Sequence, residues 1–350
     1  MEGEGAEPMR RNRDVGTTME PSTDEHVVSA HGSSKTVAMP SPPSIPIGVG
    51  EVAEITQAQG RPYPWRVPFG PFRLQHEKTH SRMLRSETGE VLLKEYRVIT
   101  PEARQEREAL AIAGAERLGV NVPKILGAGT TESTAWTLFQ LLPGSPGSLR
   151  PGQSLIDFVD QVVDLGTELH SRALDAAPGT GWFVSEKEEW TQREFLMSQF
   201  SPSASSRPWW SDLDRALEAT VLGPVVYLHG DLKAEHFIVD HNRVAVVDWE
   251  ACARGPACHD RADALFHALR DLLYLGWGLY QLPHGLLQRF QVPGPVMAHR
   301  VLLWLDRRPP HGMEAASRRN LDRLMLAEPA EVSRCAADLL SAAMRQGVPR

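Results

Sequence analysis

Two aspartates, each following a short and largely apolar segment, carry the strongest chemical signal in this 350-residue sequence. Asp231 ends the run Leu228-His229-Gly230-Asp231, and Asp248 follows residues 243–247. Both carboxylates are therefore expected at strand ends, where they can face one site. Phosphoryl transfer needs two such groups, because one orients the acceptor hydroxyl and the other holds a metal ion on the nucleotide phosphates. Either aspartate alone would more simply be a turn residue, but the pair with its flanking residues predicts a phosphotransferase site.

The residues around both aspartates resemble a known family. The order His-x-Asp-Leu-Lys followed by a distant Asp is that of the kinase catalytic and metal loops. His229-Gly230-Asp231 and Asp248-Trp249-Glu250 resemble the aminoglycoside phosphotransferase and choline kinase branch of the protein-kinase-like superfamily, and the segment 255–260 is similar to its Gly-Asp-Pro-x-x-Asp tail. The resemblance covers about residues 69–273. It implies an α+β, bilobal protein-kinase-like fold with a small strand-rich N-lobe and a larger helical C-lobe.

The resemblance also implies roles near the aspartates. Asp231 would orient or deprotonate the attacking hydroxyl, Lys233 would contact the transferred phosphoryl group, and Asp248 would hold Mg²⁺. His229 would support the loop from behind, while Asp260 would tether the catalytic loop and cap its own helix. Because a free aspartate is a weak base at neutral pH, alignment and electrostatics should supply most of the rate.

His236 stands where the family usually has Asn. Imidazole suits softer metals such as Mn²⁺, whereas Mg²⁺ prefers oxygen ligands. Three interpretations are open. His236 ligates a second metal ion, or it contacts phosphate and leaves Asp248 with a single ion, or the site is degraded. The presence of Lys94, Asp231 and Asp248 favours a working enzyme over a degraded site.

A lysine in the middle of an apolar strand marks the expected nucleotide side. Lys94, within residues 91–96, would meet the α- and β-phosphates, and its carboxylate partner should lie on the following helix. Glu108 fits the family's Arg-Glu-Ala-x-x-Leu pattern best, with Glu102 and Glu106 as alternatives.

The phosphate-covering loop and the hinge are expected at residues 76–82 and 139–144. The first contains no glycine, so backbone N–H groups and a hydroxyl such as that of Ser81 would have to hold phosphate. By resemblance, the backbone of Gln140 and Leu142 would meet the purine edge, with Phe139 at the back of the pocket. ATP is the expected nucleotide, GTP is an alternative, and Mg²⁺ or Mn²⁺ is the expected metal.

The elements that must position these residues follow from the sequence pattern. Residues 62–144 predict the N-lobe, with strands at 82–85, 90–96, 125–129 and 135–142, a hairpin turn at 86–89, and a helix at 101–118 that Thr100 could cap. Residues 145–350 predict the C-lobe, including helices at 154–174 and 260–280. Residues 1–50 are rich in Ser, Pro, Gly, Glu and Thr and are expected to be disordered.

Composition narrows the partners and the compartment. A net charge of −7 disfavours nucleic acid as a partner. The sequence has no apolar run near the roughly 18 residues of a membrane span and no signal peptide, so no membrane partner is expected. Cys252, Cys258 and Cys335 show no metal spacing and cannot all pair, which fits the reducing cytoplasm.

The acceptor and the class of function stay open. The segment 170–221 should form the acceptor site, and its aromatic and acidic residues would suit a cationic acceptor, although core packing and a solvated helix face explain them more simply. These residues are Trp182, Phe183, Trp190, Phe195, Trp209, Trp210, Glu186, Glu188, Glu189 and Glu194.

Three functions are considered. The first is metal-dependent transfer of the nucleotide γ-phosphoryl group to a hydroxyl of a small molecule, aminoglycoside-like or another natural product. The second is a Ser/Thr kinase acting on a peptide or protein, such as a natural-product precursor peptide, which Lys233 and the long N-terminal segment favour. The third is a nucleotide-binding pseudokinase scaffold, suggested by His236 and the glycine-free loop.

Overall fold

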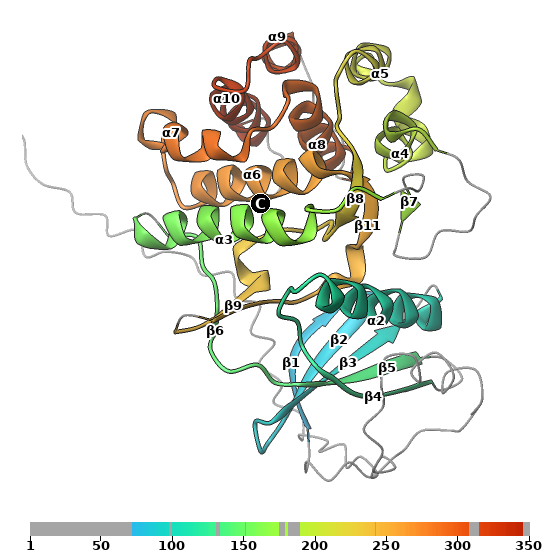
Figure 1. Ribbon diagram of the computed structural model, residues 1–350. Helices are drawn as coiled ribbons and strands as arrows, with labels where there is room; N and C mark the ends of the chain where they lie inside the picture. Colours follow the sequence, from blue (N-terminus) through green and yellow to red (C-terminus); the bar gives the residue numbers. More distant parts are fainter. Residues whose placement is uncertain are drawn as a thin grey trace, which may run out of the picture. The chain divides into compact units, whose positions relative to one another are not determined.

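Five antiparallel strands and one long helix form the first part of the described chain (Figure 1). The computed structural model describes residues 72–97, 100–130, 134–150, 152–174, 179–180, 190–241, 243–307 and 315–345, all within one compact unit of residues 37–350. The segment 1–50, expected to be disordered, lies outside the described residues. The sheet has the order β1-β2-β3-β5-β4. Its strands are β1 (Phe72–Lys78), β2 (Ser81–Ser86), β3 (Val91–Arg97), β4 (Ile125–Thr130) and β5 (Thr134–Gln140).

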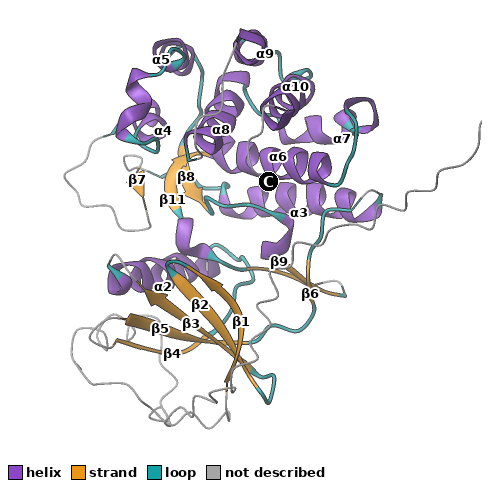
Figure 2. Cartoon of the chain, turned by 180° about the vertical axis from the view of Figure 1, so that it is seen from behind, coloured by secondary structure: helices purple, strands orange, loops and turns teal. Residues whose placement is uncertain are grey.

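The alternation of side chains along β3 gives the sheet two different faces. Successive residues of a strand point to opposite faces. Val91 and Leu93 pack with Phe72, Leu84, Trp136 and Leu138 in a small apolar cluster on one face. Lys94 and Tyr96 point to the other face, where both contact Glu108 of helix α2 (Pro101–Arg117). Figure 2 shows α2 lying along the sheet.

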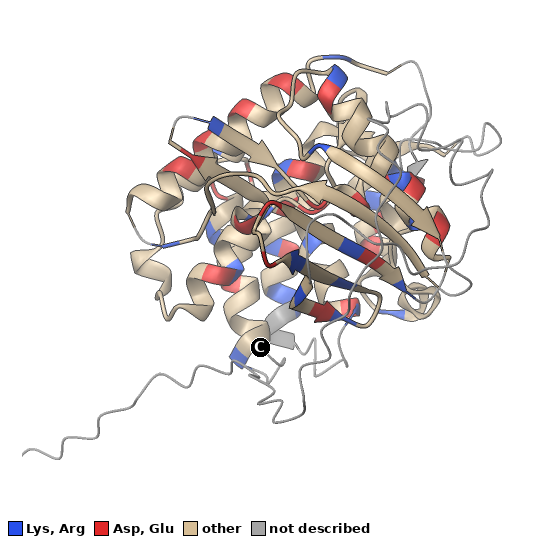
Figure 3. Cartoon of the chain, turned by 90° about the horizontal axis from the view of Figure 1, so that it is seen from below, with Lys and Arg blue, Asp and Glu red and all other residues tan. Residues whose placement is uncertain are grey.

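Ion pairs link β2 with its neighbour β3, and β3 with β1 across the intervening β2. Arg82 of β2 donates to Glu95 of β3, with its Nη2 2.8 Å from Oε1. Arg97 of β3 donates to Glu77 of β1 at 2.5 Å. Figure 3, which views the molecule from below, shows basic and acidic segments side by side on the strands. Cross-strand pairs of opposite charge support strand register.

Helix α2 begins as the sequence predicts but without the predicted cap. Pro101 is the first helical residue, where its missing N–H is not needed. Thr100 adopts a left-handed conformation with φ of 49° and makes no side-chain capping hydrogen bond, so the expectation that it caps the helix is wrong. The helix ends at Arg117, and Gly119 with φ of 95° turns the chain away.

Helices make up most of the remaining described chain. They are α3 (Gln153–Leu169), α4 (Gln192–Met197), α5 (Trp210–Glu218), α6 (Ala257–Tyr274), α7 (His284–Leu287), α8 (Gly294–Asp306), α9 (Ala315–Met325) and α10 (Val332–Arg345), with short 3₁₀ turns at Pro202–Ser206, Leu279–Gln281 and Gln288–Phe290. Helix α6 contacts α3, α8 and α10, and most of its residues are buried (Figure 1). It is therefore a rigid base for anything attached to it.

Two of the predicted helices differ in their ends from those observed. The helix predicted at 154–174 spans 153–169, because Leu174 instead donates its N–H to Val225 O at 2.8 Å. The helix predicted at 260–280 spans 257–274. It starts directly after Pro256 and stops before Gly276, whose φ is 85°. Asp260 thus lies inside the first turns of α6 and does not cap it, which corrects the predicted cap.

Two small sheets carry the loops that hold the aspartates. One has the order β10-β9-β6, from Arg243–Val246, Phe237–Asp240 and Ser145–Pro146. The other has the order β7-β11-β8, from Gly179–Thr180, Ala253–Pro256 and Val225–Leu228. Residues 229–236 connect β8 to β9, and residues 247–252 connect β10 to β11. Because Leu228 pairs with Ala253, the two connections start and end side by side.

Candidate active site

The loop that carries Asp231 is tied to helix α6 by one buried carboxylate. Asp260 is fully buried and accepts the backbone N–H groups of His229 and Gly230, each at 2.8 Å. The ring Nε2 of His170 lies 3.1 Å from the same carboxylate. Burial raises the pKa of Asp260, but the contact with His170 outweighs it and lowers the pKa. The tether predicted from the sequence is therefore present, and it acts on the backbone of the loop.

A close approach of two loops explains the glycine between His229 and Asp231. Gly230 has φ of 83°, and a Cβ there would lie 2.1 Å from the carbonyl oxygen of Ala251. His229 crosses the same gap, with Nε2 3.0 Å from Val247 O and its ring 4.6 Å from that of Trp249. His229 therefore joins the loop at 229–236 to the loop at 247–252, the supporting place that the sequence predicts for it.

Asp231 lies between two basic side chains, those of Lys233 and His267. Its Oδ2 is 3.2 Å from Nζ of Lys233, and its Oδ1 is 3.4 Å from Nε2 of His267. Burial raises the pKa of the Asp231 carboxyl, but the contact with His267 and the charge of Lys233 outweigh it and hold the pKa well below its usual range. A carboxylate of such low basicity is suited to orient a hydroxyl rather than to keep its proton.

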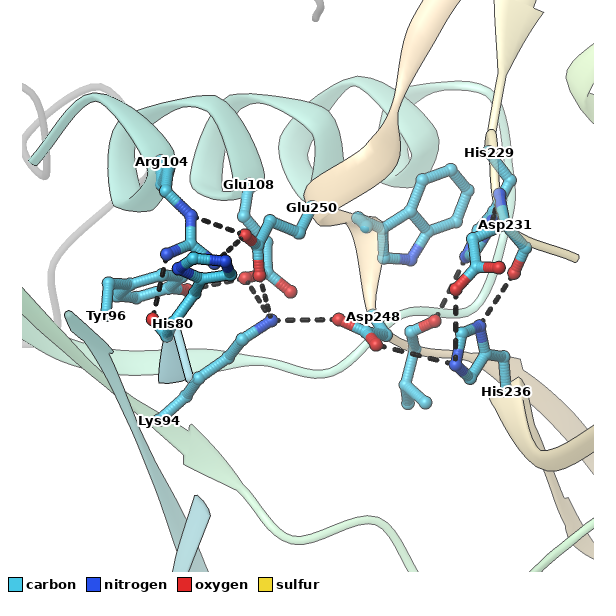
Figure 4. Close-up of polar contacts among 12 residues, drawn as sticks. His80, Lys94, Tyr96, Arg104, Glu108, His229, Asp231, His236, Asp248 and Glu250 are labelled. Carbon is cyan, nitrogen blue, oxygen red and sulfur yellow. Dashed lines mark hydrogen bonds and ion pairs between the residues drawn. The ribbon is translucent and has the colours of Figure 1, made fainter. Parts of the chain in front are cut away.

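His236 directs an unprotonated ring nitrogen at two carboxylates. Its Nδ1 lies 2.8 Å from the backbone carbonyl of Asp231, which can only accept, so Nδ1 carries the proton. The opposite nitrogen, Nε2, lies 3.4 Å from Asp248 Oδ2 and 4.0 Å from Asp231 Oδ2 (Figure 4). Burial lowers the pKa of His236 to about 4, even though Asp248 raises it, and the ring is neutral at pH 7.

These donor atoms fit a divalent metal ion. One atom each of Asp231, His236 and Asp248 lie within 4.8 Å of one another. A neutral imidazole fixed by a hydrogen bond from its other nitrogen is the usual form of a metal-binding histidine. Asp248 has φ of 64°, a left-handed conformation that is unfavourable for residues other than glycine. This conformation turns the Asp248 carboxylate toward Asp231 and His236.

Lys94 and Glu108 form the ion pair that the sequence predicts, and two further carboxylates join it. Lys94 Nζ lies 2.8 Å from Glu108 Oε2, 2.8 Å from Asp248 Oδ1 and 3.2 Å from Glu250 Oε2. Glu108 also accepts from Tyr96 Oη at 2.5 Å. Burial lowers the pKa of Lys94, but Glu108 and Asp248 outweigh it and raise the pKa well above its usual range. The amine is therefore a fixed positive charge beside Asp248.

Glu250 is a member of the site that the sequence reading did not single out. Arg104 of α2 donates to it through Nε at 2.6 Å and also through Nη2. The same arginine donates to His80 O in the turn between β1 and β2 at 2.8 Å (Figure 4). Arg104 thus links that turn, α2 and the loop after Asp248. The acidic residue that follows Trp249 was the available signal.

The segment 76–82, expected to cover the phosphates, contains the end of β1, a two-residue turn at Thr79-His80 and the start of β2. Ser81 is the first residue of β2, where its side chain is buried opposite Tyr96. Lys78, at the end of β1, is exposed. Burial raises the pKa of the Asp248 carboxyl, but the charge of Lys94 and, more weakly, that of Lys78 contribute to a net lowering of this pKa. Lys78 is therefore a further cation whose charge reaches the Asp248 carboxylate, and no sequence motif indicated it.

The predicted hinge residues lie at the end of β5. Gln140 is the last residue of the strand, and its backbone N–H is taken by Lys124 O at 2.9 Å. Only its carbonyl is therefore available to a purine edge. Leu142 follows two residues later and is half-buried, while Phe139 is buried in the core beneath. These positions are compatible with the predicted contacts, which stay a prediction.

The aromatic residues predicted for the acceptor site lie mainly in the core where the chain is described. Phe195 and Trp209 are buried, and Trp190 and Trp210 pack against the same core. Glu194 forms a capping box with Thr191 at the start of α4. The other residues predicted for this site, Trp182, Phe183, Glu186, Glu188 and Glu189, lie outside the described residues. Core packing and capping thus account for the described members of this set.

Comparison with known proteins identifies the family. A model of the phosphotransferase enzyme family matches residues 75–289, more than half of the sequence. The chain belongs to the phosphotransferase enzyme family. No curated protein matches this phosphotransferase.

Solved structures share its fold. Aminoglycoside phosphotransferase APH(4)-Ia, as the apo form of a thermostable mutant, matches with 16% identity and a TM-score of 0.50, over 78% of this chain and 94% of that one. A ternary complex of that protein with ADP and hygromycin B matches with 15% identity and a TM-score of 0.50, over 80% and 95% of the two chains. The bilobal, α+β protein-kinase-like fold expected from the sequence is thereby confirmed.

Two other expectations concern the chain as a whole. Cys252, Cys258 and Cys335 are buried, and no disulfide bond joins them in the described part of the chain. Among the described helices, none combines the length and the apolar character that crossing a membrane requires.

Proposed function

We propose that this phosphotransferase moves the γ-phosphoryl group of ATP to a hydroxyl of a small molecule. One observation carries the proposal: Lys94 and His236 approach opposite oxygens of Asp248, at 2.8 and 3.4 Å, while the Asp231 carboxylate lies 4.0 Å from the same imidazole. A cation, a metal-binding pair and an acceptor-orienting carboxylate are the parts that phosphoryl transfer requires.

Each side chain has a task in this reaction. The Lys94 amine, held by Glu108, neutralises charge on the α- and β-phosphates of the nucleotide, and Lys78 adds a second cation from the end of β1. Asp231 accepts a hydrogen bond from the acceptor hydroxyl and directs its oxygen at the γ-phosphorus. Lys233, now 3.2 Å from Asp231, stabilises the charge on the transferred group. Alignment and fixed charges supply most of the rate in such a site.

His236 and Asp248 would hold Mg²⁺ or Mn²⁺, with Nε2 of the histidine and a carboxylate oxygen as ligands. Such an ion neutralises phosphate charge when it is bound. This assignment makes His236 a metal ligand, as in the first of its three interpretations, but of an ion shared with Asp248, because its proton-free nitrogen faces that carboxylate. Nitrogen ligation makes Mn²⁺ an effective substitute for Mg²⁺.

A small-molecule acceptor is favoured by the relatives. The family is one of phosphotransferases, and the ternary complex of APH(4)-Ia contains ADP and hygromycin B. A peptide acceptor and a nucleotide-binding scaffold are the competing outcomes of the test below.

The test begins with nucleotide binding, measured by thermal shift with ATP and with GTP, each with Mg²⁺ or Mn²⁺. Wild type, Asp248→Ala and a control, Asp240→Ala, are compared, since Asp240 is a partly exposed carboxylate on the neighbouring strand β9. A nucleotide at a hundred times its Kd adds about 2.7 kcal/mol of stability, a shift of several degrees. We expect a metal-dependent shift in wild type and in the control, and its loss in Asp248→Ala.

Acceptor screening by ADP release then separates the classes, with aminoglycosides and other hydroxyl-bearing natural products in one panel and Ser/Thr peptides in another. Turnover with the first panel that is lost in Asp231→Ala supports the proposal. Turnover with peptides alone identifies a Ser/Thr kinase. A nucleotide shift without turnover in either panel identifies a nucleotide-binding scaffold. The absence of any nucleotide shift in wild type refutes the proposed function.

A further inference from the structure

Behind Asp231 lies a cluster of three buried side chains to which the proposed chemistry assigns no role. Asp263 and His267 lie one turn apart on α6, and Arg300 projects from α8. They are 2%, 4% and 9% exposed. We call Asp263, His267 and Arg300 the support cluster. Burying three ionisable groups is costly unless each is paired, so their arrangement needs an explanation.

The support cluster is not a metal site, although Asp231, Asp263 and His267 bring three ligand atoms within 4.8 Å of one another. Arg300 already supplies the positive charge there. Its Nε donates to Asp263 Oδ1, and its Nη2 lies 3.3 Å from His267 Nε2. The guanidinium also lies over the ring of Phe266, with Cζ 3.9 Å from the centroid. A second cation beside this fixed charge would be repelled.

One nitrogen of His267 faces all of these groups, and this decides which nitrogen carries the proton. Nε2 lies 3.4 Å from Asp231 Oδ1 and 3.6 Å from Asp263 Oδ1, whereas Nδ1 is buried without a hydrogen-bond partner. A proton on Nδ1 would leave a buried donor unpaired and would point the lone pair of Nε2 at two carboxylates. A proton on Nε2 removes both penalties, although it faces Arg300 Nη2, which can only donate, at 3.3 Å. Two carboxylate contacts outweigh that one, so Nε2–H is the favoured donor toward Asp231.

The same helix also holds the backbone beside Asp231. Asp263 Oδ2 accepts the N–H of Leu232, the residue that follows Asp231. Asp263 is itself fixed by Arg300. Helix α6 therefore contacts the backbone next to the catalytic carboxylate and one of its two oxygens at once. A hydrogen bond to a catalytic carboxylate is often long before substrates bind and shortens in the reacting complex, in agreement with the 3.4 Å observed.

We propose that His267 is a positioning residue for Asp231. Its Nε2–H holds Oδ1, so that Oδ2, on the side of Lys233, is the oxygen left to bind the acceptor hydroxyl. Asp263, itself fixed by Arg300, lies on the same side of the imidazole and keeps it in place. This inference rests on the proposed function, because the orientation of Asp231 affects turnover only if Asp231 binds an acceptor.

The test compares His267→Leu, which removes the donor, with His267→Gln, whose amide can place an N–H near the position of Nε2. The matched control is His259→Leu, a buried histidine on the same helix whose Nε2 contacts Gln199 at 3.2 Å. We expect kcat to fall about 10- to 100-fold in His267→Leu, with unchanged KM for nucleotide. The Gln variant should recover most of the loss, and the control should keep wild-type kcat.

A second measurement needs no acceptor. In ¹⁵N-labelled full-length protein, the ring signals of His267 report which nitrogen carries the proton. We expect the Nε2–H form, with a ring signal that shifts in Asp231→Asn. The Nδ1–H form, or no response to Asp231→Asn, overturns the proposal.

Failure of this inference and failure of the proposed function give different results. If wild type and His267→Leu turn over equally, the positioning role is refuted while the phosphotransferase activity stands. If wild type shows no turnover with any acceptor, the proposed function fails, and the ring signals alone decide whether His267 holds Asp231. If Leu and Gln variants lose kcat equally while the control does not, donation by His267 is not what matters and the proposal is wrong.

Discussion

Removing the charge of Lys94 should destabilise the protein before any nucleotide is added. The Lys94 side chain is only 6% exposed and neutralises three carboxylates, at 2.8 Å (Glu108), 2.8 Å (Asp248) and 3.2 Å (Glu250). Lys94→Met keeps most of the apolar stem and removes the amine. Uncompensated buried charge costs about 3–5 kcal/mol when one partner of a pair is lost. Because Asp248 and Glu250 retain 30% and 21% exposure, water can screen them, and the lower value of about 3 kcal/mol is expected.

This loss should appear as a fall in Tm of about 5 °C in calorimetry of the nucleotide-free protein. The control is Lys124→Met, an exposed lysine of the same lobe, which should change stability by less than about 0.5 kcal/mol. Adding Glu108→Gln to Lys94→Met removes the most buried of the three carboxylates and should recover part of the loss. The reasoning is refuted if Lys94→Met has the same Tm as wild type, or if the double variant is no more stable than Lys94→Met alone.

Further predictions follow from the metal ligands and from the loop contacts. His236→Asn restores an oxygen ligand and should shift the metal preference of nucleotide binding from Mn²⁺ toward Mg²⁺, whereas His236→Leu should weaken binding with both; thermal shifts in each metal measure this. Asp260→Asn should lower the free energy of unfolding by about 3 kcal/mol in urea titrations, because a fully buried carboxylate accepts two backbone N–H groups; unchanged stability would contradict the tether. The pKa of Asp260 is lowered in the folded state, so its contribution is complete above the unfolded pKa of about 4 and is lost as pH falls through the folded value. Wild type should therefore lose more stability on acidification than Asp260→Asn. Gly230→Ala should impair folding or activity far more than Gly276→Ala, since both have φ near +85° but only the first meets a carbonyl oxygen, at 2.1 Å; equal effects would remove the steric explanation.

Local patterns were enough to predict the strands and helices that position the nucleotide side. The strand predicted at 90–96 is Val91–Arg97, and the helix predicted at 101–118 is Pro101–Arg117. Their signals are short-range: alternating burial in the strand and a proline at the first helical position. The ends of helices in the C-lobe were less accurate, because distant residues decide them. The helix at 153–169 stops early where the chain leaves it to bond Val225.

In the candidate site, too, short motifs predicted some residues and the packing of distant segments decided others. The motif residues Asp231, His236 and Asp248 converge as their spacing predicts, and Lys94 joins them across 154 residues. The motif gives no indication that Asp231 also contacts His267. His267 lies on a largely apolar helix, where a histidine is far more often part of the core than of a site. Arg300 and Asp263 become partners only when α6 and α8 pack against each other.

The sequence by itself therefore determined the fold, the family and the two loops that carry Asp231 and Asp248, because strand alternation, helix-start signals and loop motifs each depend on short segments of the chain. Only the tertiary structure decided which charges meet. The three carboxylates around Lys94, the proton-free nitrogen of His236 facing Asp248, and the support cluster behind Asp231 come from segments far apart in the chain. Electrostatic interactions depend on distance and burial in space, and no local sequence pattern specifies either of them.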